Sequence, residues 1–451
     1  MPLMDSCVNH PRAEVFERIS QILDCLPTIS EMVLQDLTGG VKNRHTGAEG
    51  MSAEQVLRAA IIKQTEGFSY EELAFHLVDS RSYRNFCRIG IAHKGFKKSA
   101  LCSNIKAISE QSWENIHRLV LAYAESQKVE KGKESRIDCT VVETNIHEPS
   151  DSSLLWDCVR VLTRKLLQIN EHFEEVKVQF SDHRRRAKKR MLGIMNAKNK
   201  KVRMQRYVDL LKVTEKTLGY AQSAVVVLGS SVLRDPMKMI MAEGIIAELK
   251  RIILLTQGVM DQTRRRVLNG EKVAASEKIV SIFEPHTDII VKDRRDIFYG
   301  HKVCLSGGPS NLITDCLIVK GNPADSTLTT EMLDRHERIY GRYPLKAALD
   351  GGFASKENLR VAKTRGIKDV CFAKKRGLKQ EEMCRSPWVY NRLRRFRAGI
   401  ESGISWLKRC FGLTRCTWKS FRSFKSYVWA SIVSANLMTL GRCETAAETV
   451  T

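Results

Sequence analysis

Alternating apolar and polar positions predict a strand over residues 136–145. Its apolar positions are Ile137, Val141 and Val142, interleaved with threonines, and Pro149 ends the pattern. Asp138 lies near the start of this strand. A carboxylate among β-branched residues is costly to bury unless a cation compensates it. Asp138 is therefore a candidate for chemistry, although an exposed strand face would accommodate it equally well.

Helical spacing of apolar residues dominates residues 1–130. Ser52 is placed to cap one helix, and Ser69 with Glu72 forms a Ser-x-x-Glu capping box for the next. The glycine-containing turn over 65–68 between these helices is typical of a helix-turn-helix. A third helix near 80–89 and the loop after it would carry the cations Arg81, Arg84, Arg88, Lys94, Lys97 and Lys98. The pattern indicates either a DNA-reading module or a helical bundle with a solvated basic face.

After a second helical block, the pattern changes to strands at about residue 286. In the helical block, Ser152 or Ser153 would cap the first helix. The strands 299–305 and 312–319 flank a loop rich in glycine and serine, and this predicted hairpin would lie beside the strand of Asp138. There follow a helix over 327–340, a strand over 345–350, a helix from 355 to 366, a strand over 367–373, and helices over 389–411 and 421–440.

This order predicts an α/β protein with an interrupted core. The predicted segments are a helical N-terminal region over 1–130, the first core strand over 131–150, a basic helical insertion over 151–283, and the rest of the core with a C-terminal helix over 284–451.

The charge of the chain favours a polyanionic partner. Lysine and arginine number 74 against 51 acids, which gives a net charge of +23. Residues 183–208 contain eleven of these cations and no acid. The cluster begins with Arg184, Arg185, Arg186, Lys188, Lys189 and Arg190. A run of charge is usually a solvated helix face, but a DNA backbone would relieve the repulsion between these cations.

The cysteines and the apolar segments favour a cytoplasmic protein. The 13 cysteines include no Cys-x-x-Cys pair, and we expect reduced thiols rather than a zinc site. The N-terminus has no signal-peptide pattern. The longest apolar run, over 427–440, is too short and too serine-rich to span a bilayer, so no membrane association is expected.

The helix over 389–411 carries a carboxylate beside its buried face. Its apolar stripe consists of Leu393, Phe396, Ile400, Ile404, Leu407 and Phe411. Glu401 follows this stripe one residue further round, with Arg397 one turn before it and Lys408 two turns after it. Gly399 and Gly403 flank Glu401 and keep the helix surface low. The alternative is an ordinary Arg–Glu pair on a solvated face.

Asp350 ends a predicted strand and is followed by two glycines. Ligands of open α/β sheets gather at this end of the strands. Together, Asp138, Asp350 and Glu401 supply hard oxygen donors, which suit Mg²⁺ or Mn²⁺ rather than zinc. Two such ions can clamp the attacking and leaving oxygens of a phosphodiester displacement.

The spacing Arg397-x3-Glu401-x6-Lys408 resembles the Tyr-Arg-Glu-Lys signature of a superfamily of DDE transposases from bacterial insertion sequences. Arg394 stands where that signature has tyrosine. The segments that begin at Asp138, at Gly321 and at Leu349 also resemble this family, and the similarity covers most of residues 50–440. The resemblance implies a ribonuclease-H-like mixed-sheet core, interrupted by a long helical insertion, with an all-helical N-terminal DNA-binding region.

The resemblance also implies a reaction and its partners. Two Mg²⁺ or Mn²⁺ ions on Asp138, Asp350 and Glu401 would support cleavage of double-stranded DNA at terminal inverted repeats. The released 3′-hydroxyl ends would then attack target DNA directly. Arg397, Lys408 and Arg394 would bind this DNA, and a homodimer or larger assembly is expected on it. The rival interpretations are a nuclease of the same fold that does not join ends, and a helix-turn-helix DNA-binding protein without catalysis.

For five further polar or aromatic residues, the sequence favours a structural role or leaves open whether the residue is structural or contacts DNA. Glu143 lies on the opposite strand face from Asp138 and favours a structural role. Asp325 is placed to cap the next helix. His147 could position DNA or be satisfied within its loop. Trp406 and Trp418 could stack on bases or pack in the core.

Overall fold

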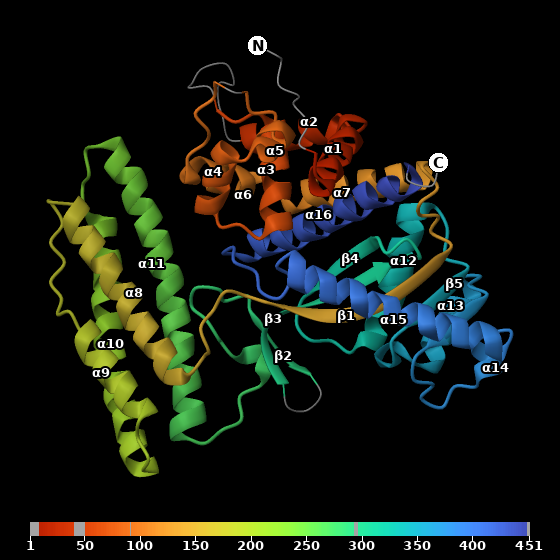
Figure 1. Cartoon of the computed structure of the whole chain (residues 1–451). Helices are drawn as coiled ribbons and strands as arrows, with labels where there is room; N and C mark the ends of the chain where they lie inside the picture. Colours follow the sequence, from red (N-terminus) through yellow and green to blue (C-terminus); the bar gives the residue numbers. More distant parts are fainter. Residues whose placement is uncertain (1–8, 40–49, 91, 293–295, 449–451) are drawn as a thin grey trace. The chain divides into compact units, whose positions relative to one another are not determined.

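The computed structural model describes residues 9–39, 50–90, 92–292 and 296–448. Residues 1–8, on which the signal-peptide prediction rests, lie outside this part. Internal contacts divide the chain into two units (Figure 1). The first unit joins Met1–Thr144 to Gly300–Thr451, and the second is Asn145–Tyr299. The helical insertion predicted over 151–283 lies entirely within the second unit.

A mixed sheet forms the base of the first unit. Its strands are β1 (Glu134–Glu143), β3 (Asp296–Gly307, entering this unit at Gly300), β4 (Ile313–Val319), β5 (Lys346–Leu349) and β6 (Asp369–Phe372). They lie in the order β4-β3-β1-β5-β6. β1 is antiparallel to β3 and parallel to β5, so the predicted pairing of the first strand with the hairpin is confirmed. The mixed α/β architecture is consistent with the ribonuclease-H-like core implied by the sequence.

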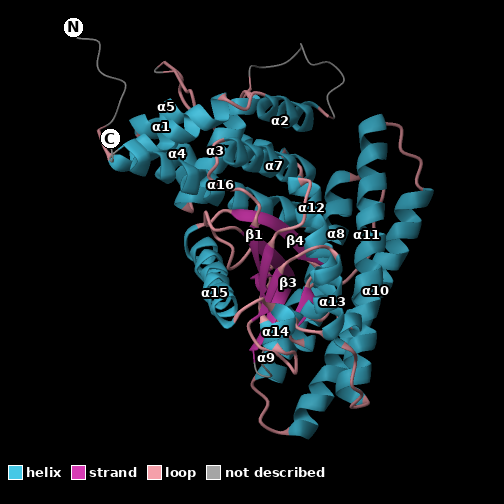
Figure 2. Ribbon diagram, turned by 90° about the vertical axis from the view of Figure 1, so that its right-hand side faces the viewer, coloured by secondary structure: helices cyan, strands magenta, loops and turns pink. Residues whose placement is uncertain are grey.

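Helices cover both faces of this sheet (Figure 2). Those that follow the hairpin are α12 (Thr329–Tyr340), α13 (Lys356–Thr364), α14 (Gln380–Met383), α15 (Pro387–Cys410) and α16 (Phe421–Glu448). α15 lies on one face of the strands, and α12 and α13 lie on the other. Ser355 caps α13, and Gly341 ends α12 in the left-handed conformation, in agreement with the predicted end of one helix at residue 340 and start of the next at residue 355.

The N-terminal part of the first unit is helical. Its helices are α1 (Pro11–Asp24), α2 (Thr28–Thr38), α3 (Ala53–Glu66), α4 (Tyr70–Asp79), α5 (Arg81–Phe86), α6 (Lys98–Ala107) and α7 (Glu110–Ser126). The capping boxes at Ser52 and Ser69 are both formed. Lys98, predicted in a loop, instead begins α6, and α5 is shorter than the predicted helix.

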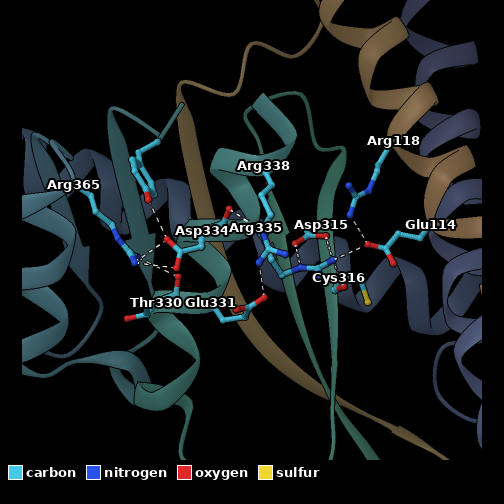
Figure 3. A network of polar contacts seen from close by, with 11 residues as sticks. Glu114, Arg118, Asp315, Cys316, Thr330, Glu331, Asp334, Arg335, Arg338 and Arg365 are labelled. Carbon is cyan, nitrogen blue, oxygen red and sulfur yellow. Dashed lines mark hydrogen bonds and ion pairs between the residues drawn. The ribbon is translucent and has the colours of Figure 1, made fainter. Parts of the chain in front are cut away.

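These N-terminal helices share a hydrophobic core with α16 and with strands β3 and β4. A polar network reinforces the junction (Figure 3). Arg335 of α12 donates to Asp315 of β4 at 2.5 and 2.7 Å, and its Nη2 lies 3.2 Å from Glu114 of α7. Because Asp315 is buried, its charge needs this partner, and the network ties a helix of the N-terminal part to the sheet.

The second unit is mainly helical and has its own hydrophobic core. Its elements are α8 (Asp151–His172), α9 (Arg184–Met195), α10 (Lys200–Ser230), α11 (Pro236–Thr263), a π-helix over Arg264–Leu268 and the strand β2 (Asp288–Lys292). The cap of α8 is Ser150 rather than Ser152 or Ser153; Ser153 completes the capping box from inside the first turn. Among the described residues of both units, none of the helices combines the length and the apolar character that a membrane span requires.

Candidate active site

Three carboxylates from distant parts of the sequence meet at one guanidinium group. Nη2 of Arg397 lies 3.0 Å from Oδ2 of Asp138 and 2.8 Å from Oδ1 of Asp350. Nη1 of the same side chain lies 2.7 Å from Oε1 of Glu401. The structure therefore brings together the three acidic residues singled out in the sequence.

Sheet register explains why two of these carboxylates are neighbours. β1 and β5 run parallel, and Ile137 is paired with Leu349. Asp138 follows Ile137, and Asp350 follows Leu349. Both acids therefore lie at the same level of adjacent strands. Asp138 continues β1, whereas Asp350 leaves β5 and caps the short 3₁₀ helix Gly351–Phe353. α15 lies against β1 and β5 and adds Arg397 and Glu401.

The environment disfavours negative charge on Asp138. Its side chain is only 15% exposed, and burial raises its pKa to about 6. Arg397 opposes this rise, whereas the neighbouring charges of Asp350 and Glu401 add to it. Three carboxylates thus share the charge of one guanidinium, that of Arg397.

The approach of α15 to β1 depends on a residue pair that the sequence did not reveal. Arg136 of β1 stacks its guanidinium on the ring of Phe396 at 4.9 Å and donates to the carbonyl of Phe396 at 3.2 Å. A Cβ atom at Gly399 would lie 1.9 Å from Nη1 of Arg136. Gly399 was expected to keep the helix surface low, and the structure shows that the space is filled by an arginine of the neighbouring strand.

Comparison with known families identifies the chain. A family model described as a transposase DDE domain matches residues 293–437, and one described as transposase domain (DUF772) matches residues 8–107. Together they span more than half of the chain. The chain belongs to the DDE transposases of insertion sequences. A search of curated proteins and a search of solved structures returned no match.

Only two of the three candidate carboxylates of this transposase lie within a region that matches a family model. Asp350 and Glu401 lie within the DDE-domain match, whereas Asp138 lies between the two matches. The connection of Asp138 to the other acids therefore depends on the geometry around Arg397. The family implies DNA binding and the general use of divalent metal ions.

The donor set fits a hard divalent ion in chemical type. Three carboxylates without histidine or cysteine are the ligands that Mg²⁺ prefers in phosphoryl-transfer sites. Within the described residues, no group of acidic, histidine or cysteine side chains is already arranged to hold a metal. At this site, the guanidinium of Arg397 forms an ion pair with each of the three carboxylates.

Other residues of the signature lie on the same helix as Glu401. Arg394 is exposed and Lys408 is half-buried, near the end of α15. The carbonyl of Lys408 accepts a hydrogen bond from the hydroxyl of Thr414 at 3.2 Å. Arg394 and Lys408 remain candidates for DNA contact.

Acidic residues pair with part of the basic cluster of α9, which the sequence did not indicate. Asp182 lies 2.6 Å from Arg184, and Asp209 lies 2.6 Å from Arg190 and 3.9 Å from Arg186. Both acids lie just outside residues 183–208, the range in which the sequence analysis found no acid. Arg185, Lys188 and Lys189 are exposed and form no ion pair among the described residues. Three of the six predicted DNA-binding cations are thus already compensated.

The structure also shows the surroundings of four other residues that the sequence analysis considered. Asp325 is not a helix cap but accepts from Lys302 at 2.9 Å. His147 is bound within its own unit, with Nε2 2.7 Å from Asp157. Trp418 is buried, and Trp406 packs edge-on against Phe411, so both contribute to packing.

Proposed function

We propose that this transposase cleaves DNA at the terminal inverted repeats of its insertion sequence and joins the ends to target DNA. The observation that carries the proposal is the convergence of Asp138, Asp350 and Glu401 on one cation. Three carboxylates from separate elements are unfavourable together unless a positive group occupies their centre. Such an arrangement suits a site that receives divalent ions.

The carboxylates have two roles in the proposed reaction. Asp138, the most enclosed, would hold the divalent ions together with Asp350 and Glu401. When bound there, divalent ions supply nucleophile activation and charge stabilisation at the phosphate oxygens. Glu401 is 58% exposed, so it can accept the proton of the incoming nucleophile.

The chemistry has two displacements at phosphorus. In the first, a water oxygen attacks a phosphodiester at the end of the element, the bond to the 3′ oxygen breaks, and a 3′-hydroxyl is released. In the second, that hydroxyl attacks a phosphodiester of the target, and a target 3′ oxygen leaves. Arg397, once displaced from the carboxylates, would bind a phosphate beside the scissile bond together with Lys408.

Two regions are proposed to bind the DNA outside the active site. In the first unit these are the helices of the N-terminal region, including the capped pair α3 and α4. In the second unit the unpaired Arg185, Lys188 and Lys189 of α9 offer contacts to phosphates. We place the protein in the bacterial cytoplasm on the nucleoid, acting as a homodimer or larger assembly because an element has two ends.

An in-vitro strand-transfer assay tests the proposal. The substrate is a pre-cut terminal repeat, taken from the inverted repeats that flank the gene, with plasmid DNA and Mg²⁺. Joined product is expected from the wild-type chain, and none from Asp350→Asn, which should still bind the repeat. Glu357→Gln, a change of an exposed carboxylate on α13, serves as the matched control and should join normally. Cleavage without joining would indicate a nuclease, and binding alone a non-catalytic protein.

A further inference from the structure

A basic cavity lies in the first unit, apart from the carboxylates. It has a volume of about 760 Å³, which falls in the range of small-molecule sites. Residues of α3, α4 and α6 line it together with the segment Phe411–Trp418 and Tyr427 of α16. Its size far exceeds what a single inorganic anion needs, and its wall includes several aromatic rings.

Two lysines of this cavity lack counter-charges. Lys63 is 7% exposed, and neither Lys63 nor Lys106 forms an ion pair or hydrogen bond among the described residues. Their ammonium groups lie 4.9 and 5.6 Å from the ring centre of Tyr70. An aromatic ring offsets only part of the cost of burying an ammonium group. Burial, with repulsion from Lys106, lowers the pKa of Lys63 to about 8.

Two neighbouring hydrogen-bond donors also lack an acceptor. The hydroxyl of Tyr70 and Nε1 of Trp418 are buried and have no hydrogen-bond partner among the described residues. The two acids that line the cavity are paired within its wall: Glu71 lies 2.7 Å from Lys98, and Glu72 accepts from the backbone of Ser69 at 2.7 Å. Neither acid forms an ion pair with Lys63 or Lys106 among the described residues, so these two lysines and the two buried donors still need an acceptor.

The cavity is connected to two of the three elements that position the carboxylates, β1 and α15. The backbone of Glu143, at the end of β1, donates to Thr414 at 3.1 Å and accepts from Cys416 at 2.8 Å. Leu413 is bound to the last turn of α15 through the carbonyl of Leu407 at 3.2 Å. Glu401 lies ten positions before Phe411, the start of this segment, which corresponds to about 15 Å of helix length.

We propose that this cavity binds a nucleotide, with its phosphate on Lys63 and Lys106 and its base against the partly exposed aromatic wall at Tyr70. A phosphate supplies the charge and the acceptors that the lysines and buried donors lack. Aromatic side chains supply stacking surface for a base. The nucleotide belongs to a DNA strand or is free in solution. Either source leaves the inference independent of strand joining, because binding requires no catalysis.

Binding to the full-length chain is measured in EDTA by fluorescence and by thermal shift. The probes are a 5′-phosphorylated pentathymidylate and free thymidine 5′-diphosphate. Lys63→Met is expected to weaken binding at least tenfold and to raise the melting temperature, because it removes a buried uncompensated charge. Lys106→Met, at a less buried position, gives a second test of the same contact. Lys320→Met, an exposed lysine after β4, is the matched control and should behave as the wild type.

The two probes distinguish the sources. Lysine-dependent binding of the oligonucleotide alone assigns the cavity to a DNA strand, and lysine-dependent binding of the diphosphate alone, or of both, assigns it to a free or a shared nucleotide. The inference is overturned if neither probe binds. It is also overturned if Lys63→Met and Lys106→Met both bind as tightly as the wild type, or if Lys320→Met loses binding equally.

Discussion

The guanidinium of Arg397 lies 3.0 Å from the carboxylate of Asp138, at the point where the proposed ions would bind. The same nitrogen reaches Asp350, and both Arg397 and Asp138 are 15% exposed. Arg397 therefore acts as an internal counter-ion in the absence of metal. In the proposed reaction, metal loading would exchange this cation for others, and the released guanidinium would become available to a phosphate.

Removal of this counter-ion should make stability depend on metal. Without divalent ions, Arg397→Ala is expected to lower the free energy of unfolding by about 2 kcal/mol, because partly buried carboxylates lose a charged hydrogen-bond partner. Addition of Mg²⁺ should then raise the melting temperature of the variant more than that of the wild type. Differential scanning fluorimetry with EDTA or MgCl₂ measures both effects.

Arg360→Ala is the control for this prediction. Arg360 forms an exposed pair with Glu357 on α13, and because solvent screens such a pair, its loss should change the free energy of unfolding little. Its response to Mg²⁺ should equal that of the wild type. Equal Mg²⁺ shifts in Arg397→Ala and in the wild type would contradict the role of Arg397 as a counter-ion.

The unpaired cations of α9 should control the salt dependence of DNA binding. Each phosphate contact contributes about −0.9 to the slope of log K against log salt concentration. The double variant Lys188→Ala/Lys189→Ala should therefore reduce this slope by about 2. Fluorescence anisotropy of a labelled duplex at several salt concentrations measures the slope.

A second pair of cations in the same unit provides the comparison. Lys250 and Arg251 are exposed on α11 and form no ion pair among the described residues. The variant Lys250→Ala/Arg251→Ala removes the same charge from another helix and should leave the slope within experimental error. If both double variants reduce it equally, general charge rather than α9 binds the DNA.

Patterns confined to one element predicted much of the fold. Ser52 and Ser69 cap their helices through residues three positions away, and the positions of Asp138 within β1 and of Asp350 directly after β5 agree with the predicted strands. The cap of α8 was less determined, because Ser150, Ser152 and Ser153 can all cap a helix. Strand β2 is short, and the pattern of apolar and polar residues did not predict it.

Features that depend on contacts between distant segments could not be predicted. Arg397 was recognised as a neighbour of Glu401 on one helix, but its contacts with Asp138 and Asp350 come from packing across the sheet. Lys63 interrupts an apolar stretch of α3, which was a usable signal. Its meaning required knowledge that Lys106 and Trp418 line the same cavity.

The buried histidine His117 should make the first unit sensitive to mild acid. Its Nε2 lies 2.8 Å from the carbonyl of Ile313, which fixes the proton there, and its Nδ1 has no partner among the described residues. Burial lowers its pKa, against the opposing charges of Asp315 and Glu114 and with a small contribution from Arg118. The ring of Trp429 packs on the remaining side.

The direction of the pH effect follows from this lowered pKa. As the pH falls below about 6.5, the unfolded chain takes up a proton before the folded protein does, so stability decreases. His117→Gln keeps a donor to Ile313 but cannot titrate. Its melting temperature should fall less than that of the wild type between pH 7.5 and pH 5. Parallel curves for the two proteins would show that other groups cause the acid sensitivity.

Two glycines of α15, four residues apart, should respond to alanine in opposite directions. A Cβ at Gly399 would lie 1.9 Å from Arg136, which is 6% exposed and held by hydrogen bonds to Phe396 and Asn311. A Cβ at Gly403 would lie 3.7 Å from Ile313, an ordinary contact. Alanine favours a helix by about 1 kcal/mol over glycine, but at position 399 the displaced guanidinium outweighs this gain.

We therefore expect Gly399→Ala to destabilise the chain by about 1 to 2 kcal/mol and Gly403→Ala to stabilise it by up to about 1 kcal/mol. Urea denaturation of both variants measures the difference. Arg136→Ala combined with Gly399→Ala supplies the coupling test, because the added methyl group should cost little once the guanidinium is gone. If Gly399→Ala is as stable as Gly403→Ala, then Arg136 moves aside freely and does not set the approach of α15 to β1.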